Sequence, residues 1–172
     1  MKKFDLRLWV ALGFGSGKIP FGPGTFGSVV GLILSFSLLQ LHSQAVFFLV
    51  LVALFFLSVY LSGYAEKILQ KRDPGCVVID EIVAIPCCWI ATLLLLPHGA
   101  GTLPDWSSQR LDWWIKNGVT IFILFRIFDI VKPWPINRSQ ELARGWGVTV
   151  DDILAAGAVN VCMIAIYSWK LI

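Results

Sequence analysis

Residues 125–136 have the sequence Phe-Arg-Ile-Phe-Asp-Ile-Val-Lys-Pro-Trp-Pro-Ile and end an apolar segment of the chain. Arg126, Asp129 and Lys132 follow one another at intervals of three, so a helix places the three charges on one side. The two prolines end this helix, because proline has no N–H and disfavours the helical conformation in the residue before it. Charges at the end of a membrane-length helix typically face partners or a wet cavity and mark a functional site. The alternative is a snorkelling Arg and Lys beside a surface Asp.

The composition of the chain indicates a membrane protein. Of its 172 residues, 57% are hydrophobic and 15% are charged, against about 45–50% and 25% in soluble domains. The length fits a single domain over residues 1–172. The net charge of +3 is modest and no basic run is present, so we expect no nucleic-acid partner. The four cysteines match no zinc or CxxC spacing, and we expect free thiols.

The apolar segments predict an all-α, polytopic membrane bundle. Residues 26–65 contain no Asp, Glu, Lys or Arg. A single helix over this range would be about 60 Å long, roughly twice the thickness of the hydrocarbon core. The range therefore holds two crossings with a turn at residues 42–44. Three further crossings are expected at residues 77–96, 113–131 and 150–169, which makes about five membrane-embedded helices. Residues 4–12 are expected to form an interfacial N-terminal helix.

The distribution of basic residues predicts the orientation of this bundle. With five crossings, one side of the membrane receives most of them: Lys2, Lys3, Arg7, Lys18, Lys67, Lys71, Arg72, Arg126, Lys132, Arg138 and Arg144. The other side receives Arg110, Lys116 and Lys170. Since cytoplasmic loops carry an excess of Lys and Arg, the first side is expected to be cytoplasmic.

Five carboxylates from three predicted helices fall at this cytoplasmic boundary: Asp80, Glu81, Asp129, Asp151 and Asp152. Packed together they would repel one another, and a divalent cation would relieve the repulsion. Oxygen ligands alone favour Mg²⁺, Mn²⁺ or Ca²⁺ over zinc. The alternative is that the two acidic pairs only cap the starts of their helices, where negative charge is favoured. This alternative does not cover Asp129, which ends its helix.

A loop rich in glycine and proline, residues 13–25, precedes the first crossing and is predicted to be irregular. Flexible backbone followed by a helix N-terminus can bind an anion. The loop has neither the P-loop spacing nor a dinucleotide-binding fingerprint, and a simple re-entrant turn is the alternative. Lys18 and Thr25 of this loop, together with Arg126 and Lys132, are the candidate phosphate-binding residues. Carboxylates, a hard metal ion and cations together favour phosphoryl chemistry at the membrane surface.

These motifs resemble the bacterial phosphatidylglycerophosphatase A family over residues 9–160. The resemblance rests on Gly13-Phe-Gly-Ser-Gly17, Gly22-Pro-Gly-Thr-Phe-Gly-Ser28, Asp80-Glu81, the 125–136 stretch and Val150-Asp-Asp-Ile153. It implies an all-helical enzyme of the bacterial inner membrane, multi-pass, with its active site on the cytoplasmic side. It further implies Mg²⁺-dependent hydrolysis of phosphatidylglycerophosphate to phosphatidylglycerol. The five carboxylates match the acidic positions of the family, and Arg126 and Lys132 match its basic ones.

From the resemblance and the residues together, we expect Mg²⁺ ligands among Asp80, Asp129, Asp151 and Asp152, and Glu81 as the base or as a partner of the ligands. All five acids are therefore candidate catalytic residues. One rival hypothesis is a CDP-alcohol phosphatidyltransferase, which would need a DGxxAR…GxxxDxxxD string that this chain lacks. Another is an ion-coupled transporter or a scaffold, whose acids would normally lie near the middle of the bilayer.

Overall fold

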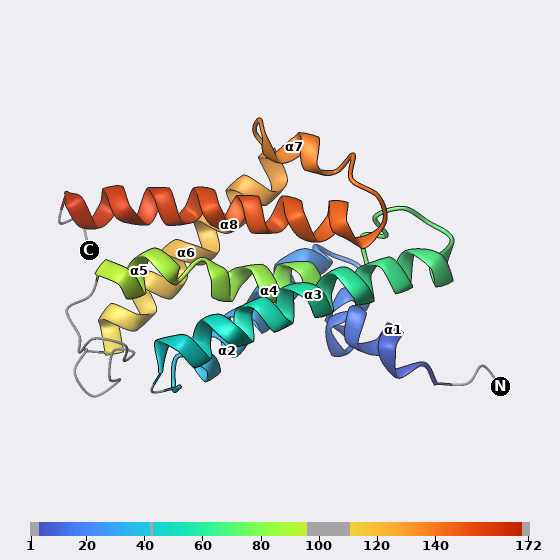
Figure 1. The fold of residues 1–172 in the computed structure, drawn as a ribbon, viewed down its shortest axis with the longest axis horizontal. Helices are drawn as coiled ribbons and strands as arrows, with labels where there is room; N and C mark the ends of the chain where they lie inside the picture. Colours follow the sequence, from blue (N-terminus) through green and yellow to red (C-terminus); the bar gives the residue numbers. More distant parts are fainter. Residues whose placement is uncertain (1–3, 42, 96–110, 170–172) are drawn as a thin grey trace.

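The structure is a computed structural model that describes residues 4–41, 43–95 and 111–169. Its elements are all helices, which confirms the all-α prediction. In chain order they are α1 (Leu6–Ala11), the 3₁₀ helix η1 (Gly13–Lys18), α2 (Pro23–Leu38), α3 (Gln44–Leu69), α4 (Ile79–Cys87), α5 (Ile90–Leu95), α6 (Leu111–Val131), α7 (Ile136–Ser139) and α8 (Gly145–Ser168). Figure 1 shows the long helices α3 and α8 running along the bundle with the short helix α4 between them.

Helix α4 lies at the centre of the bundle. It contacts α2, α3, α6 and α8, and nearly all of its residues are buried. A helix that is apolar on every side is typical of such a core position. Asp80 and Glu81 occupy its first turn, so both acids are held inside the protein rather than on its surface.

Small residues allow α2 to pack closely against α4. A Cβ atom added at Gly27 would lie 2.8 Å from the Cβ of Val78, and one added at Gly31 would lie 2.9 Å from the Cβ of Ile85. Helices in membranes commonly approach one another through small residues at this spacing. The close packing places the N-terminus of α2 beside the first turn of α4.

Helices α3 and α8 also cross at close range. A Cβ atom at Gly145 would overlap the backbone of α3 around Val59 and Gly63, and the hydroxyl groups of Ser58 and Thr149 form a buried hydrogen bond of 2.9 Å. Both helices are long and apolar enough to span a membrane, which suggests that the protein is membrane-associated. Helix α2 is also apolar but shorter, with 16 residues.

Three boundary predictions were wrong. Helix α8 begins at Gly145 rather than at residue 150, because packing against α3 overrides the low helix propensity of glycine. Within the expected segment 77–96, α4 and α5 are separate helices, and Pro86 lies in the last turn before the break. The loop expected over residues 13–25 contains η1, in which Phe14 and Gly15 have positive φ angles, and its end already belongs to α2. Residue 96 lies outside the described part of the chain.

The other helical segments agree with the sequence. Helices α2 and α3 fill the uncharged range with a turn between them, although residue 42 is outside the described residues. Helix α6 ends at Val131, directly before the two prolines, as predicted. Helix α1 lies within the expected N-terminal helix. The four cysteines are free.

Candidate active site

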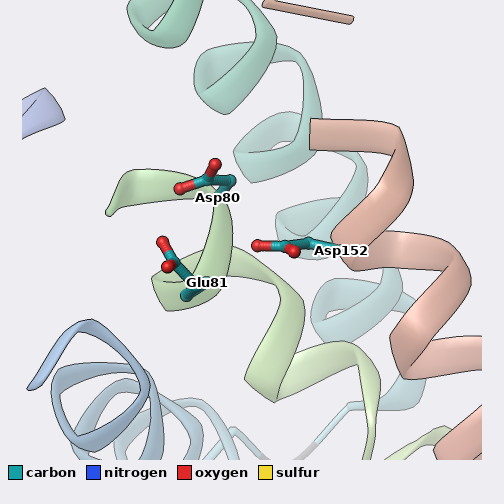
Figure 2. Close-up of side chains that lie close together, drawn as sticks. All are labelled: Asp80, Glu81 and Asp152. Atoms are coloured by element: carbon teal, nitrogen blue, oxygen red, sulfur yellow. The ribbon is translucent and has the colours of Figure 1, made fainter. Parts of the chain in front are cut away.

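Three carboxylates from two helices meet at the start of α4. Asp80 and Glu81 come from the first turn of α4, and Asp152 comes from α8, which packs against it (Figure 2). One oxygen of each residue lies within 4.8 Å of the others. Because α8 begins before residue 150, Asp152 lies within this helix rather than at its first residue, so helix capping does not explain its position.

Asp80 and Asp152 are buried and Glu81 is half-buried, and each has an oxygen without a hydrogen-bond partner among the described residues. Asp80 is 5% exposed and Asp152 is 3% exposed. Asp80 Oδ1, Glu81 Oε2 and Asp152 Oδ2 are buried without a hydrogen-bond partner among the described residues. Buried charges are normally paired or bound to metal, because an unpaired one loses its hydration without compensation. Three such oxygens close together therefore fit a hard divalent cation such as Mg²⁺.

The two remaining predicted acids pair with cations. Arg126 donates a hydrogen bond of 2.6 Å to Asp129 Oδ2. Lys132 Nζ lies 2.5 Å from Asp151 Oδ2 and 3.8 Å from Asp129 Oδ1. Gln140 donates a further hydrogen bond of 3.0 Å to Asp151 Oδ2. The charge series Arg126, Asp129, Lys132 thus forms one ion-paired face, as its spacing predicts.

Lys132 is fixed in its charged form by this arrangement. It follows the last residue of α6 with a φ of 44°, a left-handed conformation that is uncommon outside glycine. Burial acts to lower the pKa of Lys132, but the hydrogen bond to Asp151 and the nearby carboxylates outweigh it and raise the pKa above its usual value. Lys132 therefore carries a positive charge throughout the neutral pH range.

The three clustered carboxylates and the ion-paired residues Asp129, Lys132 and Asp151 line one cavity of about 160 Å³, which we call the acidic cavity. Its lining residues are Asp73, Gly75, Val77, Asp80, Glu81, Asp129, Lys132, Val148, Asp151 and Asp152. All five predicted acids and Lys132 thus line a single space, and Arg126 is joined to it through Asp129. Within the described chain, Lys18 and Thr25 are not among the lining residues; Lys18 is exposed and Thr25 is half-buried in the first turn of α2.

The N-terminus of α2 approaches this site at Gly24. A Cβ atom added there would overlap Glu81 Oε1 and lie 3.0 Å from Arg126 Nη1. Glycine is thus needed for the helix end to come this close. The approach directs the positive end of the α2 dipole toward Glu81 and Arg126, where it favours a bound anion.

The sequence reasoning missed two residues of the site, Asp73 and Gln140. Asp73 lines the acidic cavity from the connection between α3 and α4, and its N–H donates a hydrogen bond of 3.0 Å to Glu66. Gln140 follows α7 and holds Asp151. The signal for Asp73 is its place in an Asp-Pro-Gly turn shortly before Asp80. No spacing rule singles out Gln140, because only the fold of the α7–α8 connection brings it to Asp151.

The described residues form helices only, two of them of membrane-spanning length, and they bring carboxylates together with a lysine and an arginine at one cavity. This combination is typical of membrane-associated enzymes that act on phosphate esters. The comparisons with known proteins define the family. The chain belongs to the phosphatidylglycerophosphatase A family, whose model matches residues 9–167. Membership makes the protein a lipid phosphomonoesterase.

Three curated relatives are similar over most of the chain. Phosphatidylglycerophosphatase A of Haemophilus influenzae is 36% identical over 94% of this chain and 89% of its own length. A Bacteroides thetaiotaomicron protein named "Putative phosphatidylinositol-3-phosphatase" is 34% identical over 96% of each chain. Phosphatidylglycerophosphatase A of Escherichia coli is 35% identical over 85% of this chain and 74% of its own length. No solved structure gives a significant match.

Proposed function

We propose that this protein hydrolyses the terminal phosphomonoester of phosphatidylglycerophosphate, giving phosphatidylglycerol and phosphate in bacterial phospholipid biosynthesis. The family and two of the relatives bear the name of this activity. The observation that carries the chemistry is the group of three buried carboxylate oxygens without partners, which shares the acidic cavity with Lys132. Phosphoryl transfer needs this combination of metal ligands and fixed positive charge.

Asp80 and Asp152 are the proposed ligands of Mg²⁺, since the sequence prediction and the geometry both include them. Mg²⁺ is usually held by one or two carboxylates together with the phosphate of the substrate. When bound, it supplies neutralisation of charge on the phosphate and lowers the pKa of a water molecule. Asp129 and Asp151, also predicted as ligands, are proposed instead to orient Arg126 and Lys132, because their oxygens already pair with these cations.

Glu81 is the proposed proton acceptor for the attacking water. Its Oε2 has no partner among the described residues, and its Oε1, like Arg126 Nη1, lies beside Gly24 at the N-terminus of α2. Arg126, Lys132 and the N-terminus of α2 are proposed to bind the phosphate oxygens. Water attacks phosphorus as Glu81 takes one of its protons, and the bond from phosphorus to the glycerol oxygen breaks. The departing glycerol oxygen takes a proton from solvent to leave as the alcohol, and Glu81 then releases its proton to solvent.

The placement in the membrane extends this proposal. We propose a multi-pass protein of the inner membrane with about five membrane-embedded helical segments, the third of them broken into α4 and α5. The acidic cavity would face the cytoplasm. This proposal is supported by the excess of Lys and Arg in the segments that the five-crossing arrangement places on the same side of the membrane as the cavity. Cysteine-accessibility labelling in intact cells and inverted vesicles tests this orientation.

The direct test is phosphate release by the purified protein in mixed micelles. Phosphatidylglycerophosphate should be hydrolysed with Mg²⁺, and EDTA should stop the reaction. Asp80→Asn should be inactive, while Asp112→Asn, in the first turn of α6 outside the cavity, serves as the matched control. Hydrolysis of phosphatidylinositol 3-phosphate in preference to phosphatidylglycerophosphate would reassign the substrate. Release of CMP from a CDP-lipid, or ion flux in liposomes without hydrolysis, would replace the proposal by one of its rivals.

A further inference from the structure

A second hollow of about 640 Å³ lies next to the acidic cavity. It is bounded by the loop from η1 to α2, the end of α3 and the residues before α4. Gly75 lines both spaces. Gly75 has no side chain, and a Cβ atom added there would meet no atom within 4 Å in the described structure, so the wall that the two spaces share borders open space at Gly75. A molecule that occupies the acidic cavity can therefore extend past Gly75 into this second space.

The charged side chains in this hollow are two exposed lysines, Lys18 and Lys71, and we call it the lysine hollow. Its other lining residues are glycine, proline, apolar residues and a cysteine, so no carboxylate is among the residues that line it. Another hollow, of about 670 Å³, lies between α3 and the α7–α8 connection. We call it the mixed-charge hollow, because both cations and the carboxylates of Glu66 and Glu141 line it. Lys71 lines both hollows, but only the lysine hollow has cations without a carboxylate among its lining residues, which favours an anion there.

Exposed apolar side chains occur on the elements that bound the lysine hollow. Phe21 is 82% exposed and lies in the η1–α2 loop, Phe14 is 55% exposed on η1, and Leu69 is 37% exposed at the end of α3. Exposed Phe and Leu side chains on interfacial segments bury at the boundary between the lipid headgroups and the acyl chains. The position of these residues favours a hollow that opens at headgroup depth, where the phosphate of a lipid lies within reach of lysine.

We propose that the lysine hollow binds the internal phosphodiester of the lipid substrate, between Lys18 and Lys71, while the terminal phosphomonoester occupies the acidic cavity. This inference rests on the proposed function. In phosphatidylglycerophosphate a single glycerol unit joins the two phosphates, and the open wall at Gly75 is where this glycerol would pass. Lys18, predicted from the sequence to bind the substrate phosphate, then binds the phosphate that is not cleaved. Phosphatidate, with one phosphate, cannot fill both sites, so the lysine hollow determines specificity.

The experiment compares two short-chain substrates with the same acyl chains: dihexanoyl phosphatidylglycerophosphate and dihexanoyl phosphatidate. Both release phosphate from a monoester, but only the first has a phosphodiester. The measured quantity is the selectivity ratio, kcat/KM on the first substrate divided by kcat/KM on the second. In Lys18→Gln and in Lys71→Gln this ratio should fall about tenfold, mainly through KM, because each variant loses one charge-assisted contact. Lys18→Arg should retain most of the ratio.

Lys67→Gln is the matched control, since Lys67 is exposed on α3 one turn before Lys71 and lines the mixed-charge hollow instead. Its ratio should equal that of the wild type. If Lys18→Gln and Lys71→Gln lower the activity on both substrates equally, or on neither, the inference is overturned while the proposed function stands. If the wild-type protein releases no phosphate from phosphatidylglycerophosphate, the proposed function itself fails.

Discussion

Helices α4 and α8 meet at two polar places, one at each end of α4, and the two differ in how completely they are hydrogen-bonded. At the start of α4, Asp80, Glu81 and Asp152 each have a buried oxygen without a partner among the described residues. At the end of α4, Asn160 of α8 uses both ends of its amide. Its Oδ1 accepts from the N–H of Ala91 at 2.7 Å, and its Nδ2 donates to the carbonyl of Cys87 at 2.9 Å.

The difference separates a structural polar group from a functional one. Asn160 bridges the break between α4 and α5, where backbone groups lack helical partners. Both ends of its amide are satisfied by backbone groups of the protein. The acidic group costs free energy in the absence of a cation, since like charges are brought together out of water. Proteins retain such a group where ligand binding or catalysis requires it. The two ends of α4 should therefore respond to mutation in opposite ways.

The largest expected effect is that of Asp152→Asn. Without this ligand, kcat/KM for phosphatidylglycerophosphate should fall by about 1,000-fold or more, because charge neutralisation by the metal contributes several kcal/mol. The melting temperature of the metal-free protein in detergent should stay the same or rise, since a charge that repels Asp80 and Glu81 is removed. Phosphate-release kinetics and thermal unfolding in EDTA measure both quantities. A lower melting temperature that accounts for the lost activity would make Asp152 structural.

Lys132→Gln should have the second largest effect. The variant removes a fixed positive charge from the acidic cavity, and kcat/KM should fall about 100-fold, as for the loss of one donor to the reacting phosphate. Lys116→Gln on α6, an exposed lysine outside the cavity, is the matched control and should retain wild-type kinetics. Near-normal turnover by Lys132→Gln would show that the ion pair with Asp151 only holds the fold together.

The sequence was sufficient to predict the helical class and six of the charged residues that line the acidic cavity, namely Asp80, Glu81, Asp129, Lys132, Asp151 and Asp152. Both predictions depend on local pattern. Long uncharged segments indicate apolar helices, and charges at intervals of three share a helix face. The sequence was not sufficient to divide the acids into a metal-binding group and an ion-paired group. That division depends on the packing of α8 against α4 and on which acids the cations of α6 reach, and neither is visible in a local pattern.

The same limit explains the helix boundaries that were predicted incorrectly. Residues 145–147, Gly-Trp-Gly, have low helix propensity, but the first glycine lets α8 approach α3 closely, and packing decides the outcome. The break after Pro86 is tolerated because Asn160, distant in sequence, supplies hydrogen bonds to it. Gln140 and Asp73 reach the site through turns whose direction no periodicity in the sequence indicates.

Asn160→Ala tests the other end of α4. The variant leaves the carbonyl of Cys87 and the N–H of Ala91 without these partners, which should lower the free energy of unfolding by about 2 kcal/mol. Below the melting temperature, kcat/KM should stay close to wild type, because the acidic cavity is at the opposite end of α4. Thermal unfolding in detergent and phosphate release at low temperature measure the two properties. If Asn160→Ala lost activity without losing stability, the end of α4 would be functional like its start, and the contrast between the two ends would be wrong.

The smallest expected effect is that of Tyr167→Phe, at a second satisfied polar contact. The hydroxyl of Tyr167 on α8 donates to Asn117 Oδ1 on α6 at 2.5 Å, and Asn117 Nδ2 donates to the carbonyl of Trp113 at 2.9 Å. Losing the hydroxyl should cost about 1 kcal/mol of stability with no change in kinetics. A double-mutant cycle with Asn117→Ala isolates the pair, since the two residues are in contact and their effects should not add. Additive effects would mean that the two side chains contribute to stability independently.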